Sequence, residues 1–271
     1  MITSTSQGDI LIEFTDEKVV GIKLSGGMDS AIVFYMVCKH IQENNLQTAI
    51  LLMTVDKPGH GSSNSDFAKK VLYWMKQNFP TVKILSHQLD KAPDTAEDWA
   101  TAPNMDWARR EPVDEWIYHQ EKQIYETHQH TPFNIYFTGI TNNPPEEVYS
   151  QFYNSKEELL EGPDDNRSSS HPITIEHPYF LDTDGYWHLG RTNNPEVKQG
   201  EMTCINLLAQ IDKIAVTELY DKFNLRQSLL PNTRSCENDD PVLTNNFTTH
   251  CNTECWWCHE RHWGLGNQNK Y

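Results

Sequence analysis

The fold of this chain is decided by the stretch VVGIKLSGGMDS, residues 19–30, together with the segment AIVFYMVC, residues 31–38, that follows it. Residues 19–24 are apolar apart from Lys23, and the run is short enough for an inner strand. After Ser30 the apolar residues recur at helical spacing. The stretch therefore predicts a buried strand, a glycine turn and a helix.

The turn itself, residues 25–30, combines two glycines with two hydroxyls and a carboxylate. A strand-to-helix turn of this kind presents backbone N–H groups and the positive end of the helix dipole, and its glycines let a ligand approach the backbone. It is not a Walker A loop, because the Gly-Lys-Ser/Thr ending is missing. We interpret the turn as an anion site; the alternative is a plain tight turn before a helix.

Strands and helices continue to alternate through the first half of the chain. The expected elements are, in order, a strand at 48–55, a helix at 66–78, a strand at 82–87, a helix at 112–128 and a strand at 133–139. This order predicts an α/β fold with a doubly wound, mostly parallel sheet and right-handed crossovers. Asp56 follows a strand directly, so we expect it at the carboxyl edge of the sheet, where such folds bind ligands.

Other segments have less regular patterns. Residues 8–16 are typical of an edge hairpin strand, and residues 89–110 of a loop or short helix near the substrate. Apolar residues at helical spacing predict a helix over residues 205–223, with Lys213 near its middle.

Residues 142–201 are rich in Asn, Pro, Ser and acidic residues, which favours an insertion of turns and short helices over the active edge of the sheet. Within it, residues 176–180 could form a short strand. The insertion could be a lid or a surface elaboration, and the composition does not separate the two.

Composition narrows the class of protein. A chain of 271 residues can bury a full core, and 22 basic against 38 acidic residues leave a net charge of −16. That charge repels polyanions, so nucleic-acid binding is disfavoured. The N-terminal residues show neither the basic nor the apolar part of a signal peptide, and no uncharged run has membrane-spanning length. We therefore expect a cytoplasmic protein without membrane contact.

Four of the six cysteines lie within the last 36 residues. Two of them form a Cys-x2-Cys pair that can bind one metal ion, and two more complete a tetrahedral set: Cys236, Cys251, Cys255 and Cys258. Closed tetrahedra of thiolates are structural zinc sites. We expect residues 236–271 to form a zinc-binding tail; the alternative is a set of free thiols in a Trp-rich core.

The Ser-Gly-Gly-x-Asp-Ser loop resembles that of the N-type ATP pyrophosphatases, or PP-loop family. The resemblance implies a Rossmann-like sheet of the adenine nucleotide alpha hydrolase type, formed here by residues 1–235. It also implies cleavage of ATP between the α and β phosphates, usually to adenylate a carboxylate or carbonyl oxygen. By this resemblance Asp29 places Mg²⁺, and the phosphates are bound by Ser25, Gly26, Gly27 and Ser30.

The loop and the cysteine tail together resemble 7-cyano-7-deazaguanine synthase of the queuosine pathway. That family uses ATP, Mg²⁺ and ammonia to convert 7-carboxy-7-deazaguanine into its amide and then its nitrile. The resemblance implies that Lys213 opens a late helix and faces the phosphates, that Asp56 belongs to the nucleotide site, and that Arg261 matches an arginine after the last cysteine pair. The alternatives are a solvated helix lysine, and an arginine that packs on Trp257 or pairs with Glu260.

Two departures weaken the substrate assignment. Where the family has Asp-Tyr-Gly-Gln-Arg-His, residues 56–60 read Asp-Lys-Pro-Gly-His. Where it has Gly-Tyr-Pro-Asp, in a region that contacts the deazaguanine, residues 142–145 read Asn-Asn-Pro-Pro. The activation chemistry is therefore better supported than the substrate.

The resulting hypothesis is a C–N ligase in which Asp29 and Lys213 are catalytic and the partners are a deazaguanine carboxylate and ammonia. The oligomeric state stays open, a homodimer included. One rival is a PP-loop sulfurtransferase, for which Cys204 is the candidate reactive cysteine because Cys38 is expected in the core. Another is a non-catalytic module whose zinc tail binds nucleic acid or protein, with bases stacking on Trp256, Trp257 and Trp263.

Overall fold

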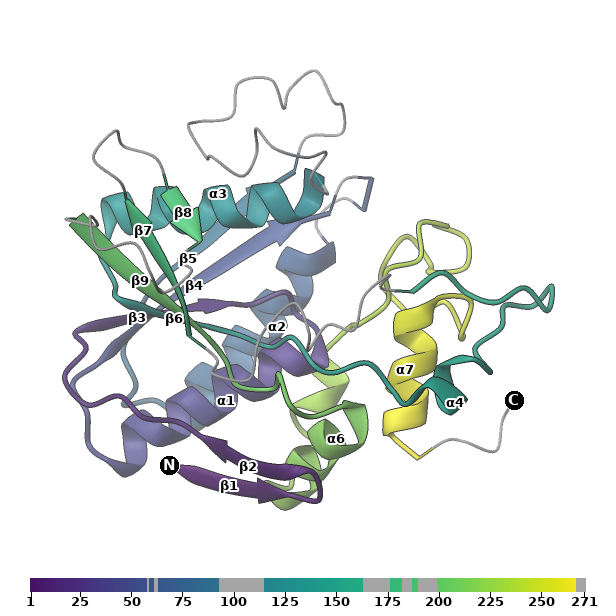
Figure 1. Cartoon of the computed structure of the whole chain (residues 1–271), viewed down its shortest axis with the longest axis horizontal. Coiled ribbons are helices and arrows are strands. Elements are labelled where there is room, and N and C mark those ends of the chain that lie inside the picture. The colour runs from purple at the N-terminus through teal and green to yellow at the C-terminus, as the bar shows by residue number, and fades with distance from the viewer. Residues whose placement is uncertain are drawn as a thin grey trace.

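The structure, a computed structural model, describes residues 1–57, 59–60, 63–92, 115–162, 176–181, 187–189 and 199–266 (Figure 1). Its strands are β1 (Ile2–Thr5), β2 (Gly8–Leu11), β3 (Val19–Lys23), β4 (Ala49–Asp56), β5 (Ile84–Lys91), β6 (Ile135–Thr138), β7 (Glu176–Leu181), β8 (Trp187–Leu189) and β9 (Gln199–Asn206). Its helices are α1 (Met28–Glu43), α2 (Ser63–Asn78), α3 (Glu115–His130), α4 (Glu146–Tyr149), α6 (Lys213–Lys222), the 3-10 turn η3 (Leu230–Asn232) and α7 (Trp256–Gly264).

The main sheet has the strand order β5-β4-β3-β6-β9-β7-β8. The first five of these strands are parallel, while β7 runs antiparallel to both β9 and β8. From β3 the chain moves outward to β4 and β5 and then returns to the other side of β3 with β6 and β9. The order thus reverses between β3 and β6, and such a switch point is where open α/β sheets bind ligands, at the carboxyl ends of the strands. The predicted doubly wound α/β fold is confirmed.

Helices cover both faces of this sheet (Figure 1). One face packs on α1, α2 and α6, and the alternate residues Val20, Ile22 and Leu24 bury their whole surface in that core. On the other face Ile124 of α3 packs in a smaller cluster with Leu51 and Met53 of β4. β3 is thus buried on both faces, as is typical of an inner parallel strand, and the turn that follows it lies at the carboxyl edge of the sheet.

The predicted helix at 205–223 is wrong in its first part. Ile205 belongs to β9 and lies opposite Phe137 of β6 in a parallel ladder. Helix α6 begins only at Lys213, because the Asp212 side chain accepts hydrogen bonds from the backbone N–H of Ile214 (2.8 Å) and Ala215 (3.5 Å) and caps it. Lys213 is therefore the first residue of its helix and does not lie near the middle.

Part of the segment at 142–201 also differs from the expected turns and short helices. β7, β8 and the first residues of β9 are strands that extend the main sheet beyond the edge that β9 would otherwise leave unpaired. The strand expected at 176–180 is confirmed as β7. The remaining residues 163–175, 182–186 and 190–198 lie outside the described residues, as do residues 93–110 of the expected substrate loop.

The N-terminal hairpin forms a two-stranded sheet of its own, with Ile2 opposite Leu11. It lies beside α6, where the backbone N–H of Ser6 donates to Glu218 Oε2 (2.7 Å) and Lys222 Nζ donates to the Ser4 carbonyl (3.1 Å). The hairpin strand expected at residues 8–16 is thus shorter, covering Gly8–Leu11, and it is not an edge of the main sheet. Among the helices of the described ranges, none combines the length and the apolar character that crossing a bilayer requires.

Candidate functional site

The turn after β3 folds back on itself through its two hydroxyls. Ser25 Oγ lies 3.1 Å from Ser30 Oγ and accepts a hydrogen bond from the Gly27 N–H (3.3 Å), while Ser30 Oγ donates to the Gly27 carbonyl (3.2 Å). Helix α1 starts without a side-chain cap, because its N-cap residue is Gly27. The positive end of a helix of 16 residues therefore faces this hydroxyl-lined turn, an arrangement that suits a phosphate.

Gly26 fixes the turn against α2. Its φ of +79° lies in the left-handed region, and a Cβ at this position would be 2.7 Å from Phe67 Cβ and 2.8 Å from the Ala68 backbone nitrogen. Its carbonyl accepts a hydrogen bond from the Arg234 N–H (2.9 Å). The turn is thus held between α2 and the segment that leads into the cysteine tail.

Asp29 and Lys213 meet at this edge of the sheet. Lys213 Nζ forms an ion pair with Asp29 Oδ2, donates to Thr141 Oγ1 (3.4 Å) in the loop after β6, and lies 3.6 Å from Glu260 Oε2 of α7. The lysine is only 2% exposed, which rules out the solvated helix lysine. The structure therefore brings together the turn at residues 25–30, from here on the phosphate-type turn, an acid and a buried cation at the switch point between β3 and β6.

The second carboxylate oxygen of Asp29 is available for a ligand. Asp29 Oδ1 is shielded from solvent and makes no hydrogen bond to any residue that the structure describes. A buried acceptor without a donor costs free energy, so this oxygen is suited to a cation or another bound group.

Asp56 lies at the end of β4, but its carboxylate is already engaged. Its two oxygens accept hydrogen bonds from the Ser65 N–H (2.8 Å) and the Ser65 hydroxyl (2.5 Å), and the side chain is buried. Asp56 thus accepts a hydrogen bond from a backbone N–H in the first turn of α2 that has no partner within the helix. Its hydrogen bonds among the described residues go to α2, and not to Asp29 or Lys213.

The loop after β4 contacts the cysteine tail instead of opening to solvent. His60 Nε2 lies 2.5 Å from Asp239 Oδ1, and the ring stacks on Phe247 with centroids 4.5 Å apart. Burial lowers the pKa of His60 more than the bond to Asp239 raises it. A cavity of about 650 Å³ opens beside these rings, between the start of α2 and residues 246–248 of the tail.

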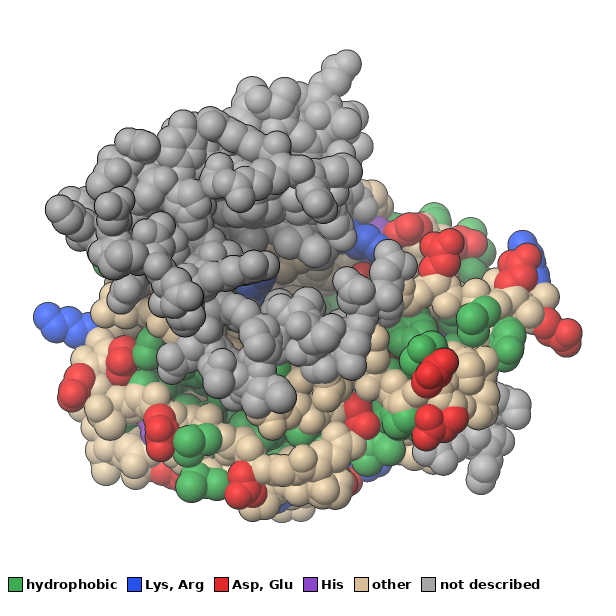
Figure 2. Space-filling view, in the orientation of Figure 1, with side chains coloured by type: hydrophobic (Ala, Val, Ile, Leu, Met, Phe, Trp, Pro, Cys, Tyr) green, Lys and Arg blue, Asp and Glu red, His purple; other side chains and the backbone are tan. Residues whose placement is uncertain are grey.

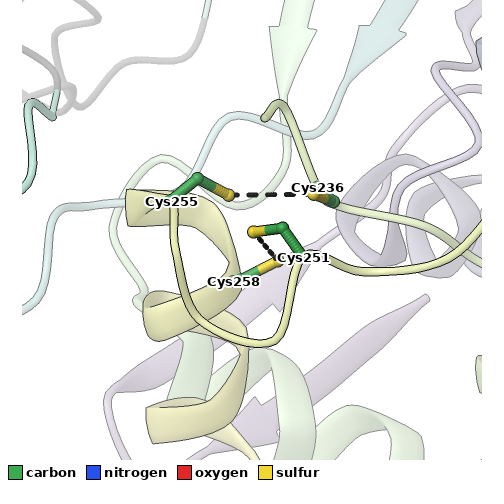
Figure 3. A group of neighbouring side chains, drawn as sticks. All are labelled: Cys236, Cys251, Cys255 and Cys258. Atoms are coloured by element: carbon green, nitrogen blue, oxygen red, sulfur yellow. Dashed lines mark hydrogen bonds between the residues drawn. The ribbon is translucent and has the colours of Figure 1, made fainter. Parts of the chain in front are cut away.

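The four tail cysteines converge on one point (Figure 3). Their sulfur atoms all lie within 4.8 Å of one another, with 3.9 Å between Cys236 and Cys255 and 3.6 Å between Cys251 and Cys258. Thiolates bound to one tetrahedral ion at about 2.3 Å stand about 3.8 Å apart, so these spacings fit a single ion. A group of four cysteines that could hold a metal is therefore present, with all four side chains buried.

The four thiols lie close enough to shift one another's pKa values. The bond from Cys251, and then those from the other neighbouring thiols, lower the pKa of Cys236, whereas the bond to Cys236 raises the pKa of Cys258. Four thiols this close cannot all ionise side by side unless a positive ion lies between them.

Arg261 of α7 links the tail to the phosphate-type turn. Its guanidinium donates to Thr233 Oγ1 (3.0 Å), Ser235 Oγ (3.2 Å) and the Leu230 carbonyl (3.4 Å). Ser235 Oγ in turn accepts a hydrogen bond from the Met28 N–H (3.3 Å) in the first turn of α1. Arg261 is expected at the site from the sequence, whereas Ser235, Thr141 and Glu260 are not expected there. Of these three, only Ser235 has a position in the sequence that could indicate a role, because it directly precedes Cys236.

Two of the three tail tryptophans are not available to stack on a base. Trp256 and Trp263 are buried in a cluster with Phe152, whose ring centroid lies 5.0 Å from that of Trp256. Only Trp257 is half-buried. The expectation of a three-tryptophan stacking surface is wrong, because residues 142–162 pack over it.

The two remaining cysteines differ in their surroundings. Cys38 is fully buried in the core, where burial raises the pKa of its thiol. Cys204 lies on β9 opposite Tyr136, is half-buried, and has its sulfur 3.9 Å from Thr138 Oγ1.

Comparisons with known proteins add the following. No family model matches the chain, and no curated protein matches it. Among solved structures it is similar to the U34-tRNA thiolase NcsA from Methanococcus maripaludis with its 4Fe-4S cluster, at 11% identity and a TM-score of 0.44 over 95% of this chain and 74% of that one. It is also similar to an NAD+ synthetase from Burkholderia pseudomallei, at 9% identity and a TM-score of 0.39 over 92% and 74% of the two chains. A third likeness is to an NMN synthetase from Francisella tularensis, at 10% identity and a TM-score of 0.38 over 94% and 86%. All three scores are below 0.5, so the fold assignment rests on the strand order.

Proposed function

We propose that this chain is a PP-loop ATP pyrophosphatase that activates a carboxylate and joins it to ammonia. The observation that carries the proposal is the meeting of the turn at residues 25–30 with Asp29 and the buried Lys213 at the switch point of the sheet. Turn, acid and lysine are the parts that the cleavage of ATP between its α and β phosphates requires at one place.

The residues have distinct roles in this proposal. The N–H groups at the start of α1 and the hydroxyls of Ser25 and Ser30 bind phosphate oxygens. Lys213 neutralises the charge that develops there. The unpartnered Oδ1 of Asp29 fits a Mg²⁺ ion, which supplies further charge neutralisation to the phosphates when it is bound.

The reaction proceeds by two displacements. A carboxylate oxygen of the substrate attacks the α phosphorus, the bond from that phosphorus to the bridging oxygen breaks, and pyrophosphate leaves. Ammonia then attacks the acyl carbon, AMP leaves with the electron pair of the acyl C–O bond, and the nitrogen loses a proton to give the amide. A carboxylate oxygen is a poor leaving group, and this exchange makes AMP the leaving group instead.

The four cysteines hold zinc in this proposal. Four thiolates fill a tetrahedral sphere, so the ion is structural and offers no position for water. Its role is to fix the tail, which contacts the loop after β4 directly and the start of α1 through Arg261 and Ser235.

For the substrate we propose 7-carboxy-7-deazaguanine or a related acid, on the resemblance of the two sequence ends to 7-cyano-7-deazaguanine synthase. A small molecule suits the charge of the protein better than a nucleic acid does. Figure 2 shows Asp and Glu side chains spread over the described part of one face, with few Lys or Arg among them. Such a surface repels a phosphate backbone. We expect the reaction to take place in the cytoplasm.

The direct test is to incubate the zinc-loaded protein with Mg²⁺, ATP, ammonium and 7-carboxy-7-deazaguanine, and to follow AMP, pyrophosphate and the base by mass spectrometry. Conversion of the acid to its amide or nitrile supports the substrate. Asp29→Asn should lower pyrophosphate release about 100-fold or more while the protein stays folded. Asp221→Asn is the control, since the Asp221 side chain is 51% exposed and pairs with Arg226. Retained turnover in Asp29→Asn would remove this residue from the metal role.

Sulfur transfer to a nucleobase is the second candidate, and the position of Cys204 favours it. This half-buried cysteine lies two residues before the end of β9 at the carboxyl edge, where the substrate would be activated. A Cys204→Ser variant separates the two reactions. If the variant converts the deazaguanine acid as the wild type does, the sulfur-transfer route is excluded. If the variant still cleaves ATP but no longer forms the product, the sulfur-transfer route is favoured.

A further inference from the structure

Glu260 is a fully buried acid in the middle of the cysteine tail. Its side chain has no exposed surface, and its Oε2 lies 3.6 Å from Lys213 Nζ. The lysine thus stands between two carboxylates, Asp29 from the phosphate-type turn and Glu260 from α7. A charged group is rarely buried completely unless a partner requires it there.

Helix α7 is fixed at its first turn by the cysteine cluster. Cys255 is its N-cap residue and Cys258 lies in the first turn, so two of the four sulfur atoms belong to the start of this helix. A metal ion held by these sulfurs therefore fixes the helix that carries Glu260 two residues further on.

The other end of α7 packs directly on the backbone of α6. A Cβ at Gly264 would lie 2.5 Å from Lys213 Cβ and 2.7 Å from the Lys213 carbonyl oxygen. Backbone contact this close leaves no room for the two helices to slide independently. The position of Lys213 is thus tied to α7 at both the backbone and the side chain.

We propose that Glu260 is a positioning residue for Lys213, and that the cysteine-bound metal acts on the nucleotide site through it. The inference rests on the proposed function for the role of Lys213. Asp29 has one negative charge, which it would share between Lys213 and Mg²⁺, so Glu260 supplies the further counter-charge beside the buried lysine. Without that partner the ammonium group would lie in a buried site with too little counter-charge, and it would move away from the phosphates.

The test uses Glu260→Gln, which keeps the shape of the side chain and removes its charge. We expect kcat for pyrophosphate release to fall about tenfold or more, while KM for ATP changes less than about threefold, because the lysine acts on charge that develops in the transition state. Zinc content should stay equal to that of the wild type. Glu43→Gln is the control, because Glu43 pairs with Lys39 on the exposed side of α1, and it should leave kcat unchanged.

A double variant separates positioning from a structural role. If Glu260 acts through Lys213, then Lys213→Met/Glu260→Gln should be no slower than Lys213→Met alone. Losses that multiply, or a Glu260→Gln variant with wild-type kcat, would overturn the proposal. Loss of zinc from Glu260→Gln would also overturn it, since the glutamate would then act on the metal site.

Urea unfolding of the same variants tests the pair without ATP. Each single variant should lower the urea midpoint, and the double variant should recover part of the loss because neither charge is left alone. Additive losses would overturn the pairing. Failure of the wild type to cleave ATP would refute the proposed function instead, and the unfolding cycle would still decide whether Glu260 holds Lys213.

Discussion

Gly26 allows the packing of the phosphate-type turn to be measured, because the chain contains a matched control for its backbone strain. Gly26 and Gly266 have the same φ of +79°. A Cβ at Gly26 would meet Phe67 and Ala68 at 2.7 and 2.8 Å, whereas a Cβ at Gly266 would have no neighbour within 4 Å among the residues that the structure describes. Gly26→Ala therefore adds strain and a clash, while Gly266→Ala adds strain alone.

The expected costs follow from these two contributions. Left-handed backbone costs an ordinary residue about 1–2 kcal/mol, which both variants share. Crowding against a well-packed helix adds about 1–3 kcal/mol at Gly26 only, since the Ala68 backbone nitrogen cannot rotate away. Gly26→Ala should thus be about 2 kcal/mol less stable than Gly266→Ala, which corresponds to a melting midpoint about 4 °C lower for a chain of this size.

The assay is thermal and urea unfolding of both variants beside the wild type, with zinc present throughout. A change in the urea midpoint at constant slope would show that the native state has lost stability. Equal losses of stability in Gly26→Ala and Gly266→Ala would mean that the turn is not packed on α2.

Three further predictions concern the tail and the sheet. Cys258→Ser should lose the bound metal and change the tryptophan fluorescence of the tail, whereas Cys204→Ser should retain the metal; equal zinc content in both would contradict the four-cysteine site. Trp256→Ala should cost about 3–5 kcal/mol of unfolding free energy and Trp256→Phe much less, because Trp256 is buried against Phe152; urea unfolding measures both, and similar costs would contradict the packing. Burial, followed by the charges of nearby lysines, lowers the pKa of His87 to about 4 in the folded protein. The unfolded chain therefore binds a proton at a higher pH than the folded protein does. The free energy of unfolding that His87 contributes above about pH 6.5 is lost as the pH falls toward 4. His87→Gln should therefore reduce the loss of stability between pH 7 and pH 5 by about 1 kcal/mol, discounted for partial exposure, and an identical pH dependence would contradict the assignment.

The features that the sequence predicted well are local ones. The strand, turn and helix at residues 19–38 are specified by neighbours in the chain, and so are the alternating elements as far as β6. The cysteine cluster could also be predicted from the sequence, because three of its members lie within eight residues and only Cys236 is more distant.

Features that depend on distant partners could not be predicted in this way. The apolar residues of β9 and α6 merge into one helical pattern, and only the pairing of Ile205 with Phe137 separates them. Lys213 resembles a surface lysine until Asp29, 184 positions earlier, is found beside it. Glu260 has the pattern of a surface charge within a Cys-His-Glu-Arg run, and its burial follows only from the packing of α7 on α6.

Under the proposed function, the site at the switch point cleaves ATP between its α and β phosphates. The most direct measurement is phosphorus NMR of the zinc-loaded protein with Mg²⁺, ATP, ammonium and the deazaguanine acid. We expect AMP and pyrophosphate to form in equal amounts with the wild type, and neither product to form with Asp29→Asn or Lys213→Met. Formation of ADP and phosphate by the wild type, or ATP that stays intact with it, would contradict the proposed function.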